Sequence, residues 1–257
     1  MTILQAVILG IVEGFTEFLP ISSTAHLVIT SELLRIPESE FLSSFIIAIQ
    51  LGAIASIIFL YWKRIVWDFE AMKRVVVAFV PTAVIGFVLY KLLKSYLIEN
   101  LHIIAWALLL GGVVLILFER WQKDIPDRET PLAEMPYASA FVIGCIQALA
   151  IVPGVSRAGA TIVGGMWLGI GRKEIVEFSF LLAIPTMLAA TVYDLYKTGS
   201  AFAAADWLSL SIGFIVSFIA AYAGVRFLVR FIQTHSFSSF GIYRILLGGI
   251  ILTVLFF

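Results

Sequence analysis

Carboxylate, hydroxyl and imidazole groups are concentrated in one short segment near the start of the chain, GIVEGFTEFLPISSTAHLV from Gly10 to Val28. Glu13 and Glu17 are four residues apart, so in a helix they lie one turn apart on the same face. Two carboxylates in this arrangement can share a divalent cation, or they can divide into a metal ligand and a general base. An amphipathic helix whose glutamates simply face water is the competing structural interpretation.

The segment changes character at Pro20, which is followed by the hydroxyl residues Ser22, Ser23 and Thr24. Such a run can cap a new helix, whose free backbone N–H groups and positive dipole end attract an anion. His26 follows Ser23 by three residues, about one turn, so its imidazole can approach a hydroxyl or a bound phosphoryl group. A histidine near a helix start is also often a plain hydrogen-bonded residue.

A second run of this kind, PGVSRAGAT, extends from Pro153 to Thr161. Ser156 is expected to cap a helix here, with Arg157 in its first turn. A guanidinium matches phosphate with two parallel hydrogen bonds, and Thr161 falls on the same helical face as Arg157. The structural alternatives are snorkelling of Arg157 to the membrane surface and simple satisfaction of backbone groups by Ser156 and Thr161.

These motifs belong to a chain that is too apolar for a water-soluble domain. It has 257 residues, is 61% hydrophobic and only 13% charged, and its mean hydropathy is +1.05. Soluble domains are about a quarter charged. The formal net charge is zero, so the composition does not favour nucleic acid as a partner. The single cysteine, Cys145, excludes an intrachain disulfide.

Six segments are long and apolar enough to predict membrane-spanning helices. They are approximately 41–62, 75–96, 101–119, 175–195, 207–229 and 238–257. Two further apolar stretches, 2–34 and 137–170, contain the two motifs and are interrupted by Pro20 and by Pro153-Gly154. Each half of these stretches is too short to span alone, so we expect two re-entrant helical hairpins.

The chain also resembles itself at an offset of about 135 residues. PISS at 20–23 aligns with PGVS at 153–156, and LLGG at 109–112 aligns with a second LLGG at 246–249. A third match, AIQ at 48–50 with AIP at 183–185, lies between these two in both halves. Three matches in register, each half led by a broken hairpin, predict an internal repeat rather than chance similarity.

We therefore expect a single all-α integral membrane domain over residues 1–257, built from repeat 1 at about 1–122 and repeat 2 at about 136–257. Each repeat holds one hairpin and three spans. An odd number of crossings inverts the second copy relative to the first. The two breaks are then expected to meet near the membrane midplane, with their second helices starting at one cavity.

Basic side chains favour the cytoplasmic side of a membrane, so they test this topology. With the N-terminus outside, the cytoplasmic segments hold eleven basic residues and the outer segments four. The eleven are Lys63, Arg64, Lys73, Arg74, Arg120, Lys123, Arg128, Arg172, Lys173, Arg226 and Arg230; the four are Arg35, Lys91, Lys94 and Lys197. This partition predicts a multi-pass membrane protein with its N-terminus outside and a site that opens to the outer face. Trp62, Trp67, Trp121 and Trp207 are predicted interfacial anchors at span ends.

One charged residue has no evident role at this level. Arg244 lies inside the last predicted span. It can reach toward the cavity, or it can pair with Glu177 or Asp194, and the sequence does not choose between these.

EGFTEFLPISSTAH and PGVSRAGAT resemble the two signature regions of the bacterial undecaprenyl-diphosphatases, membrane enzymes associated with bacitracin resistance. The similarity covers essentially the whole chain. It implies the inverted repeat with six spans and two re-entrant hairpins, and hydrolysis of undecaprenyl diphosphate to the monophosphate carrier that is recycled in peptidoglycan synthesis. It also implies a divalent cation, Mg²⁺ or Ca²⁺, and a place in the bacterial inner membrane, where the outer face is periplasmic. Ala25 and Ala158 depart from the family pattern, which usually has glycine and serine there.

The resemblance places the family's functional positions on eight residues. The expected roles are substrate binding by Ser22, Ser156, Arg157 and Thr161, metal binding by Glu13 and Glu17, and catalysis by Glu17, Ser23, His26 and Arg157. The nucleophile stays open between Ser23, His26 and an activated water.

The expected partners are a polyprenyl diphosphate lipid and membrane lipids, without nucleic acid, and homodimerisation is left open. A secondary transporter or flippase for an anionic or lipid-linked phosphate is the alternative function, because inverted repeats with broken helices are common in that class. Fold alone does not separate an enzyme from a transporter. A purely structural membrane protein would not require the clustered polar groups.

Overall fold

The structure is a computed structural model that describes the chain except for residues 97–99, 123–130, 199–203 and 257. The side chains of residue 40 and of residues 90–96, 194–198 and 204–206 are not described either. The described residues form helices and no β-strand, so the all-α prediction is confirmed.

Ten α-helices and two short 3-10 turns make up the described part of the chain. The α-helices are α1 (Ile3–Glu17), α2 (Ser23–Leu33), α3 (Glu40–Trp67), α4 (Phe69–Tyr96), α5 (Leu101–Gln122), α6 (Tyr137–Gln147), α7 (Arg157–Trp167), α8 (Arg172–Thr198), α9 (Ala204–Phe231) and α10 (Ser238–Phe256). The 3-10 turns are η1 (Leu132–Glu134) and η2 (Ala148–Ile151).

Six of these helices, α3, α4, α5, α8, α9 and α10, are long and apolar enough to cross a membrane, as the sequence predicts. The second begins at Phe69 rather than near residue 75. Its charged first turns are helical because Glu70 forms ion pairs with Lys73 and Arg74 on the same helix. Asp68 ends α3 and accepts a hydrogen bond from the backbone N–H of Ala71, which fixes the start of α4.

The remaining four α-helices are short. α1 has 15 residues, and α2, α6 and α7 have 11 each. At 1.5 Å per residue they reach roughly 16 to 23 Å, less than the roughly 30 Å hydrocarbon core of a bilayer. The predicted breaks after α1 and α6 are therefore present, and neither helix of either pair can span alone.

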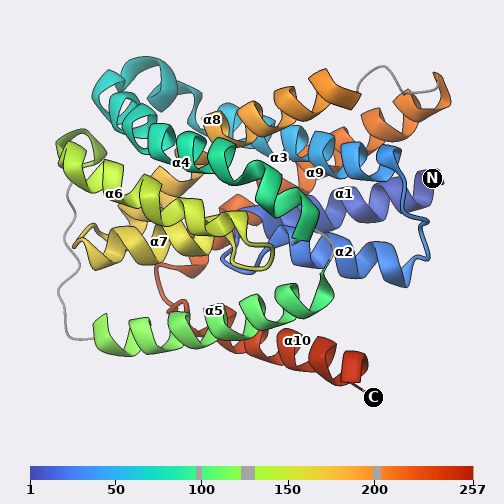
Figure 1. Cartoon of the computed structure of the whole chain (residues 1–257). Coiled ribbons are helices and arrows are strands. Elements are labelled where there is room, and N and C mark those ends of the chain that lie inside the picture. The colour runs from blue at the N-terminus through green and yellow to red at the C-terminus, as the bar shows by residue number, and fades with distance from the viewer. Residues whose placement is uncertain (97–99, 123–130, 199–203, 257) are drawn as a thin grey trace.

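The helices pack in pairs that mirror each other between the two halves of the chain (Figure 1). α1 packs along α9, and its counterpart α6 packs along α4, while α5 and α10 pack against each other. Figure 1 shows the α1–α2 hairpin entering from the end of the bundle that carries both chain termini and the α6–α7 hairpin entering from the opposite end. Both breaks consequently lie inside the bundle.

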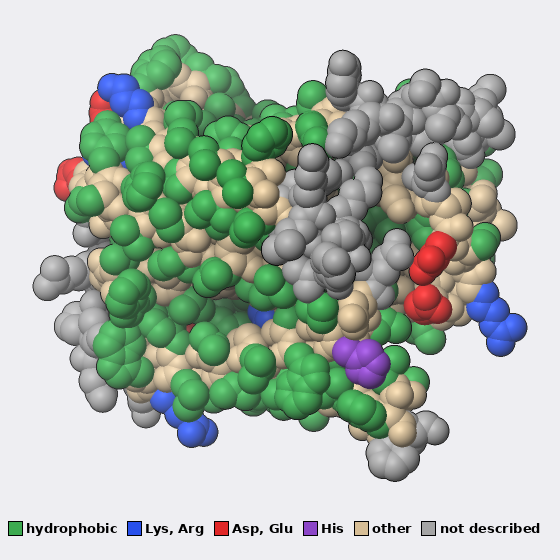
Figure 2. Space-filling model, in the orientation of Figure 1, with side chains coloured by type: hydrophobic (Ala, Val, Ile, Leu, Met, Phe, Trp, Pro, Cys, Tyr) green, Lys and Arg blue, Asp and Glu red, His purple; other side chains and the backbone are tan. Residues whose placement is uncertain are grey.

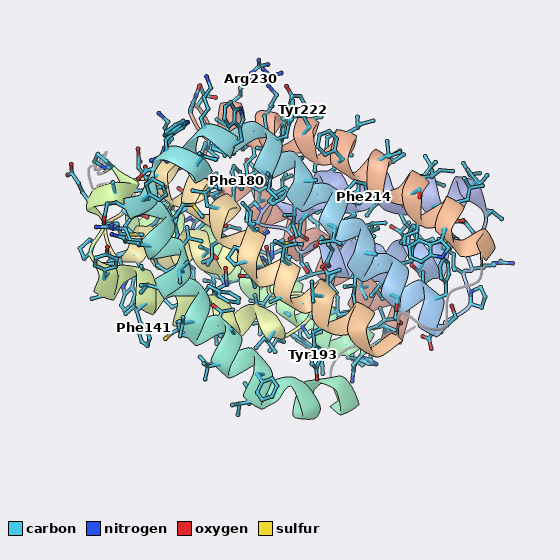
Figure 3. All side chains as sticks on the ribbon, turned by 90° about the horizontal axis from the view of Figure 1, so that it is seen from above. Phe141, Phe180, Tyr193, Phe214, Tyr222 and Arg230 are labelled. Atoms are coloured by element: carbon cyan, nitrogen blue, oxygen red, sulfur yellow. The ribbon has the colours of Figure 1, made fainter. Side chains whose placement is uncertain are left out.

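The outer surface of the bundle is largely apolar. In the face shown in Figure 2, hydrophobic side chains cover most of the described surface, and charged groups lie mainly toward its periphery. Viewed from above, Phe141 and Tyr193 project at the margin, whereas Phe180 lies between helices (Figure 3) and is fully buried. This distribution fits a helical bundle whose outside contacts lipid.

Ion pairs are found at the helix ends opposite the termini. Arg64 at the end of α3 pairs with Glu177 on α8 at 2.8 Å, and Arg172 at the start of α8 pairs with Glu119 on α5 at 3.1 Å. Most of the predicted cytoplasmic basic residues lie in these helix ends. The side chains of Lys91, Lys94, Lys123, Arg128 and Lys197 fall outside the described ones.

Candidate functional site

The two helix breaks have nearly the same backbone geometry. Ser22 has φ 70° and ψ 93°, and Ser156 has φ 73° and ψ 114°. Each serine caps the following helix, accepting a hydrogen bond from the backbone N–H three residues on, that of Ala25 or Gly159. Positive φ is uncommon and costly for residues other than glycine, so two matched cases mark backbone held in place by its surroundings.

Arg244 donates hydrogen bonds to the backbone of both breaks. Its side chain is 1% exposed and donates to five backbone carbonyls: those of Leu108, Ala107, Pro20, Gly154 and Val155. One guanidinium therefore connects the first break, the second break and α5. Of the alternatives that the sequence left open for Arg244, pairing with Glu177 is not found, since that carboxylate binds Arg64. The side chain of Asp194 lies outside the described ones.

Glycine on α5 makes room for this guanidinium. A Cβ at Gly111 would lie 2.1 Å from Nη2 of Arg244. Gly111 belongs to the first LLGG of the repeat, so part of the internal sequence similarity reflects close helix packing between α5 and α10.

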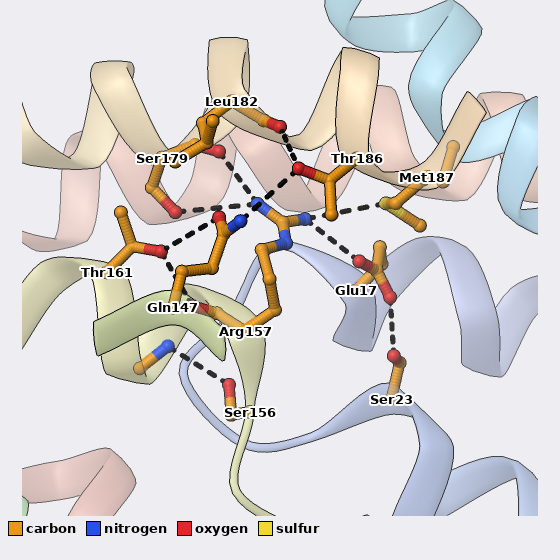
Figure 4. Close-up of polar contacts among 12 residues, drawn as sticks. Glu17, Ser23, Gln147, Ser156, Arg157, Thr161, Ser179, Leu182, Thr186 and Met187 are labelled. Atoms are coloured by element: carbon orange, nitrogen blue, oxygen red, sulfur yellow. Dashed lines mark hydrogen bonds and ion pairs between the residues drawn. The ribbon is translucent and has the colours of Figure 1, made fainter. Parts of the chain in front are cut away.

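The Glu17 side chain contacts polar groups of both hairpins (Figure 4). One carboxylate oxygen accepts a 2.5 Å hydrogen bond from the Ser23 hydroxyl, and the other accepts from Nη2 of Arg157 at 2.9 Å. The Glu17 side chain is 6% exposed and that of Arg157 is 12% exposed. The contact crosses 140 positions in the sequence and confirms that the two predicted motifs meet in space.

Arg157 is held by several groups. Its Nη1 donates to the Ser179 carbonyl at 2.7 Å, its guanidinium lies 5.6 Å from the ring centroid of Phe18, and its buried Nε has no hydrogen-bond partner. Phe18 in turn packs edge-on against Phe180 at 5.5 Å. The side chain therefore points inward and does not snorkel to the surface, and its Nε–H has no acceptor within the described residues.

Glu13 is the least satisfied polar residue of the site. It is 0% exposed, and neither carboxylate oxygen has a hydrogen-bond partner. It lies close enough to Glu17 to interact with it directly. An unpaired buried carboxyl is costly, so it calls for a proton or a cation. The described residues contain no cluster of three or more His, Cys, Asp or Glu, so a metal here would need other ligands as well.

Thr161 and Gln147 extend the site on the second hairpin. The Thr161 hydroxyl donates to the Arg157 carbonyl at 2.9 Å and contacts the Gln147 side-chain oxygen at 3.3 Å. The Gln147 amide donates to the hydroxyls of Thr82 and Thr186. Gln147 is 1% exposed, so this network fixes the second hairpin against α4 and α8.

His26 has different neighbours from those that its spacing predicts. Its Nδ1 lies 2.7 Å from the Ser22 carbonyl and its Nε2 lies 2.7 Å from the hydroxyl of Tyr243 on α10. The two rings are stacked, with centroids 5.6 Å apart. The imidazole therefore faces α10, and the hydroxyl of Ser23 is hydrogen-bonded to Glu17 instead.

The structure thus brings Glu17, Ser23 and Arg157 together, and uses Ser22 and Ser156 as caps. Sequence reasoning missed Gln147, Ser179 and Tyr243. The caps Ser22 and Ser156 are 134 residues apart, and the same offset places Gln147 opposite Glu13. Ser179 contributes a backbone carbonyl, which no side-chain pattern reveals.

Taken together, the chain is a polytopic helical protein with buried carboxylates, a serine hydroxyl and an arginine at the meeting point of two capped helices. A family profile described as "Bacitracin resistance protein BacA" matches residues 6–250. The chain belongs to this family.

Curated relatives match over nearly their full length. A protein named undecaprenyl-diphosphatase from Sulfurihydrogenibium sp. (strain YO3AOP1) is 52% identical, over 96% of this chain and 97% of its own. Proteins of the same name from Aquifex aeolicus and Persephonella marina are 50% and 43% identical, over at least 96% of each chain. The resemblance seen in the motifs is confirmed.

Proposed function

We propose that this protein is a membrane phosphatase that hydrolyses undecaprenyl diphosphate to undecaprenyl phosphate and inorganic phosphate. The observation that carries the proposal is the Ser23–Glu17–Arg157 arrangement, in which a hydroxyl, a carboxylate and a guanidinium meet between two helix N-termini. A hydroxyl with a base attached, beside an arginine, suits attack on phosphorus. The names of the relatives supply the substrate.

In this mechanism the half-helix N-termini and Arg157 hold the diphosphate, with Thr161 fixing the turn that carries Arg157. Ser23 attacks the terminal phosphorus and its proton passes to Glu17, to which it is already hydrogen-bonded. Undecaprenyl phosphate leaves with the proton from Glu17. Water then attacks the phosphoserine, and Glu17 accepts the water proton and returns it to the Ser23 oxygen as inorganic phosphate is released. Positioning and charge neutralisation supply most of the catalysis in phosphoryl transfer.

A divalent cation fits the unpaired Glu13. Glu13 and Glu17 would hold it, with diphosphate oxygens and water as further ligands, because the described residues place no third carboxylate, histidine or cysteine beside this pair. When bound, it would neutralise charge on the diphosphate oxygens. Arg157 and the Ser23 hydroxyl do not depend on it for their positions, because each is bonded directly to Glu17.

The membrane arrangement is part of the proposal. The two hairpins are re-entrant, the second half of the chain is an inverted copy of the first, and the site opens to the outer face of the inner membrane. Support comes from the mirrored helix pairs, the matched caps at Ser22 and Ser156, and the basic residues at the end opposite the termini.

The test of function is release of inorganic phosphate from a prenyl diphosphate by detergent-purified protein, with and without chelator. Turnover that falls on chelation and returns with Mg²⁺ or Ca²⁺ supports both the reaction and the cation. Saturable binding of the lipid without phosphate release would contradict the enzyme and favour the transporter alternative. Unchanged turnover in the presence of chelator would contradict the role of the cation but not the phosphatase function.

Orientation is tested with single cysteines in a Cys145→Ala background. Glu38→Cys, near the end that carries the termini, should react with an impermeant reagent in intact cells, whereas Phe69→Cys at the opposite end should react only after permeabilisation. The reverse labelling pattern would overturn the outward-facing site.

A further inference from the structure

Both nitrogens of the His26 imidazole have a hydrogen-bond partner, and the Ser22 carbonyl determines which of them carries the proton. Nδ1 lies 2.7 Å from the carbonyl of Ser22. A carbonyl oxygen can only accept, so Nδ1 must be the donor. In the neutral ring Nε2 is then an acceptor, and the Tyr243 hydroxyl, 2.7 Å away, is its donor.

The position of Tyr243 on α10 makes this contact part of the site. The next residue, Arg244, holds the carbonyls of Pro20, Gly154 and Val155. Consecutive residues on a helix point about 100° apart, so α10 directs one side chain to the two breaks and the other to the helix that starts at the first break. The residues of α5 that face α2 here, such as Ile104 and Leu108, are apolar and offer the ring no other partner.

The contact also limits what His26 can do. Both ring nitrogens are engaged, and the proton of Ser23 is directed to Glu17. His26 is therefore not the base for Ser23 in this arrangement. Tyr243 is 43% exposed, so the pair lies at an accessible edge of an otherwise buried site.

We propose that Tyr243 is a positioning residue for His26: its hydroxyl donates to Nε2 and holds the imidazole, stacked on the tyrosine ring, in the orientation that keeps Nδ1–H on the Ser22 carbonyl. The effect of this contact on turnover rests on the phosphatase function proposed above. Ser22 caps the helix that starts at the first break, so the held imidazole supports the turn beside Ser23.

The spectroscopic test does not require turnover. In protein with ¹⁵N-labelled histidine, two-bond ¹H–¹⁵N correlation distinguishes the tautomers, and His26→Asn assigns the signal among the three histidines. The expected result is an Nδ1–H signal for His26, with an Nε2 resonance that moves downfield in Tyr243→Phe, which keeps the stacked ring but removes the donor to Nε2. An unchanged Nε2 resonance in that variant would overturn the proposal. An Nε2–H signal in the unmodified protein would overturn the proposal.

The kinetic test is a double-mutant cycle. Tyr243→Phe should lower kcat about fivefold, with little change in KM, in the unmodified background, the usual effect of losing one hydrogen bond. In the His26→Asn background it should change kcat by less than about 1.5-fold, because the hydroxyl acts through the imidazole. Equal losses in both backgrounds would show that Tyr243 acts elsewhere and would overturn the proposal.

Tyr222→Phe is the matched control. Its hydroxyl contacts Arg226 at 3.0 Å on α9, and its removal should leave both the His26 Nε2 resonance and kcat unchanged. If the unmodified protein releases no phosphate from prenyl diphosphate, the proposed function fails, whereas the Nε2 measurement still decides the role of Tyr243.

Discussion

The two helix breaks share a backbone and differ in chemistry. At both, a serine in the left-handed region caps a short helix, and Arg244 binds carbonyls of both turns. The first break carries Glu13, Glu17 and Ser23, whereas the second presents Arg157. The first turn thus carries a hydroxyl and two carboxylates and the second a guanidinium, the groups to which the proposed mechanism assigns the roles of nucleophile, base and cationic clamp.

The largest effect should come from the residue that joins the two breaks. Glu17→Gln removes the acceptor for the Ser23 proton and the anionic partner of Arg157. Because a positioned general base contributes about 10² to 10⁴ in rate, phosphate release should fall at least about 100-fold. Glu32→Gln, on the exposed end of α2, is the matched control and should keep full activity. Near-normal turnover in Glu17→Gln would exclude Glu17 as the base.

A second change should disturb both breaks at once through α10. Gly111→Ala forces a methyl group against the guanidinium of Arg244, and overpacking of this kind costs about 1–3 kcal/mol. The midpoint of thermal unfolding in detergent should fall, together with activity. Gly249→Ala changes the other LLGG copy at a position with nothing within 4 Å and should be nearly neutral. Equal effects of the two substitutions would mean that Arg244 does not constrain α5.

The second break is tested by Arg157→Lys. The ammonium keeps the charge but cannot contact the Ser179 carbonyl and Glu17 with one planar fork. Turnover should fall at least about tenfold, roughly 1.4 kcal/mol of transition-state stabilisation. Arg120→Lys, on the exposed side of α5, should have no such effect. Normal kinetics in Arg157→Lys would exclude a role for the guanidinium in stabilising the transition state.

The comparison also shows what sequence can predict here. Hydropathy predicts the six spans, and the prolines at 20 and 153 predict the breaks, because both depend on local composition. The meeting of Glu17 with Arg157 followed from the repeat. The partners of Arg244 did not, because five backbone carbonyls from three segments leave no pattern in residue types. The spacing of His26 from Ser23 describes neighbours along α2 only, and it could not reveal that the imidazole contacts Tyr243 on α10.

The smallest effect tests whether the caps are equivalent. Ser22→Ala and Ser156→Ala each remove a side-chain acceptor from a helix N-terminus and leave a residue with a Cβ at positive φ, so each should lower stability by about 1 kcal/mol. Ser22→Gly and Ser156→Gly should cost less, because glycine adopts positive φ without strain. Thermal unfolding of the four variants in detergent measures this.

Equal losses at the two positions would support two copies of one turn. A loss confined to Ser22→Ala would mean that the second turn is held by Arg244 and the Gln147 network rather than by its cap. Ser39→Ala is the positive control for this assay. Ser39 caps α3 with extended backbone, so its replacement should cost the usual amount for a lost cap, about 1 kcal/mol. A loss at Ser39 without a loss at Ser156 would show that the assay detects caps and that the second turn does not depend on its own.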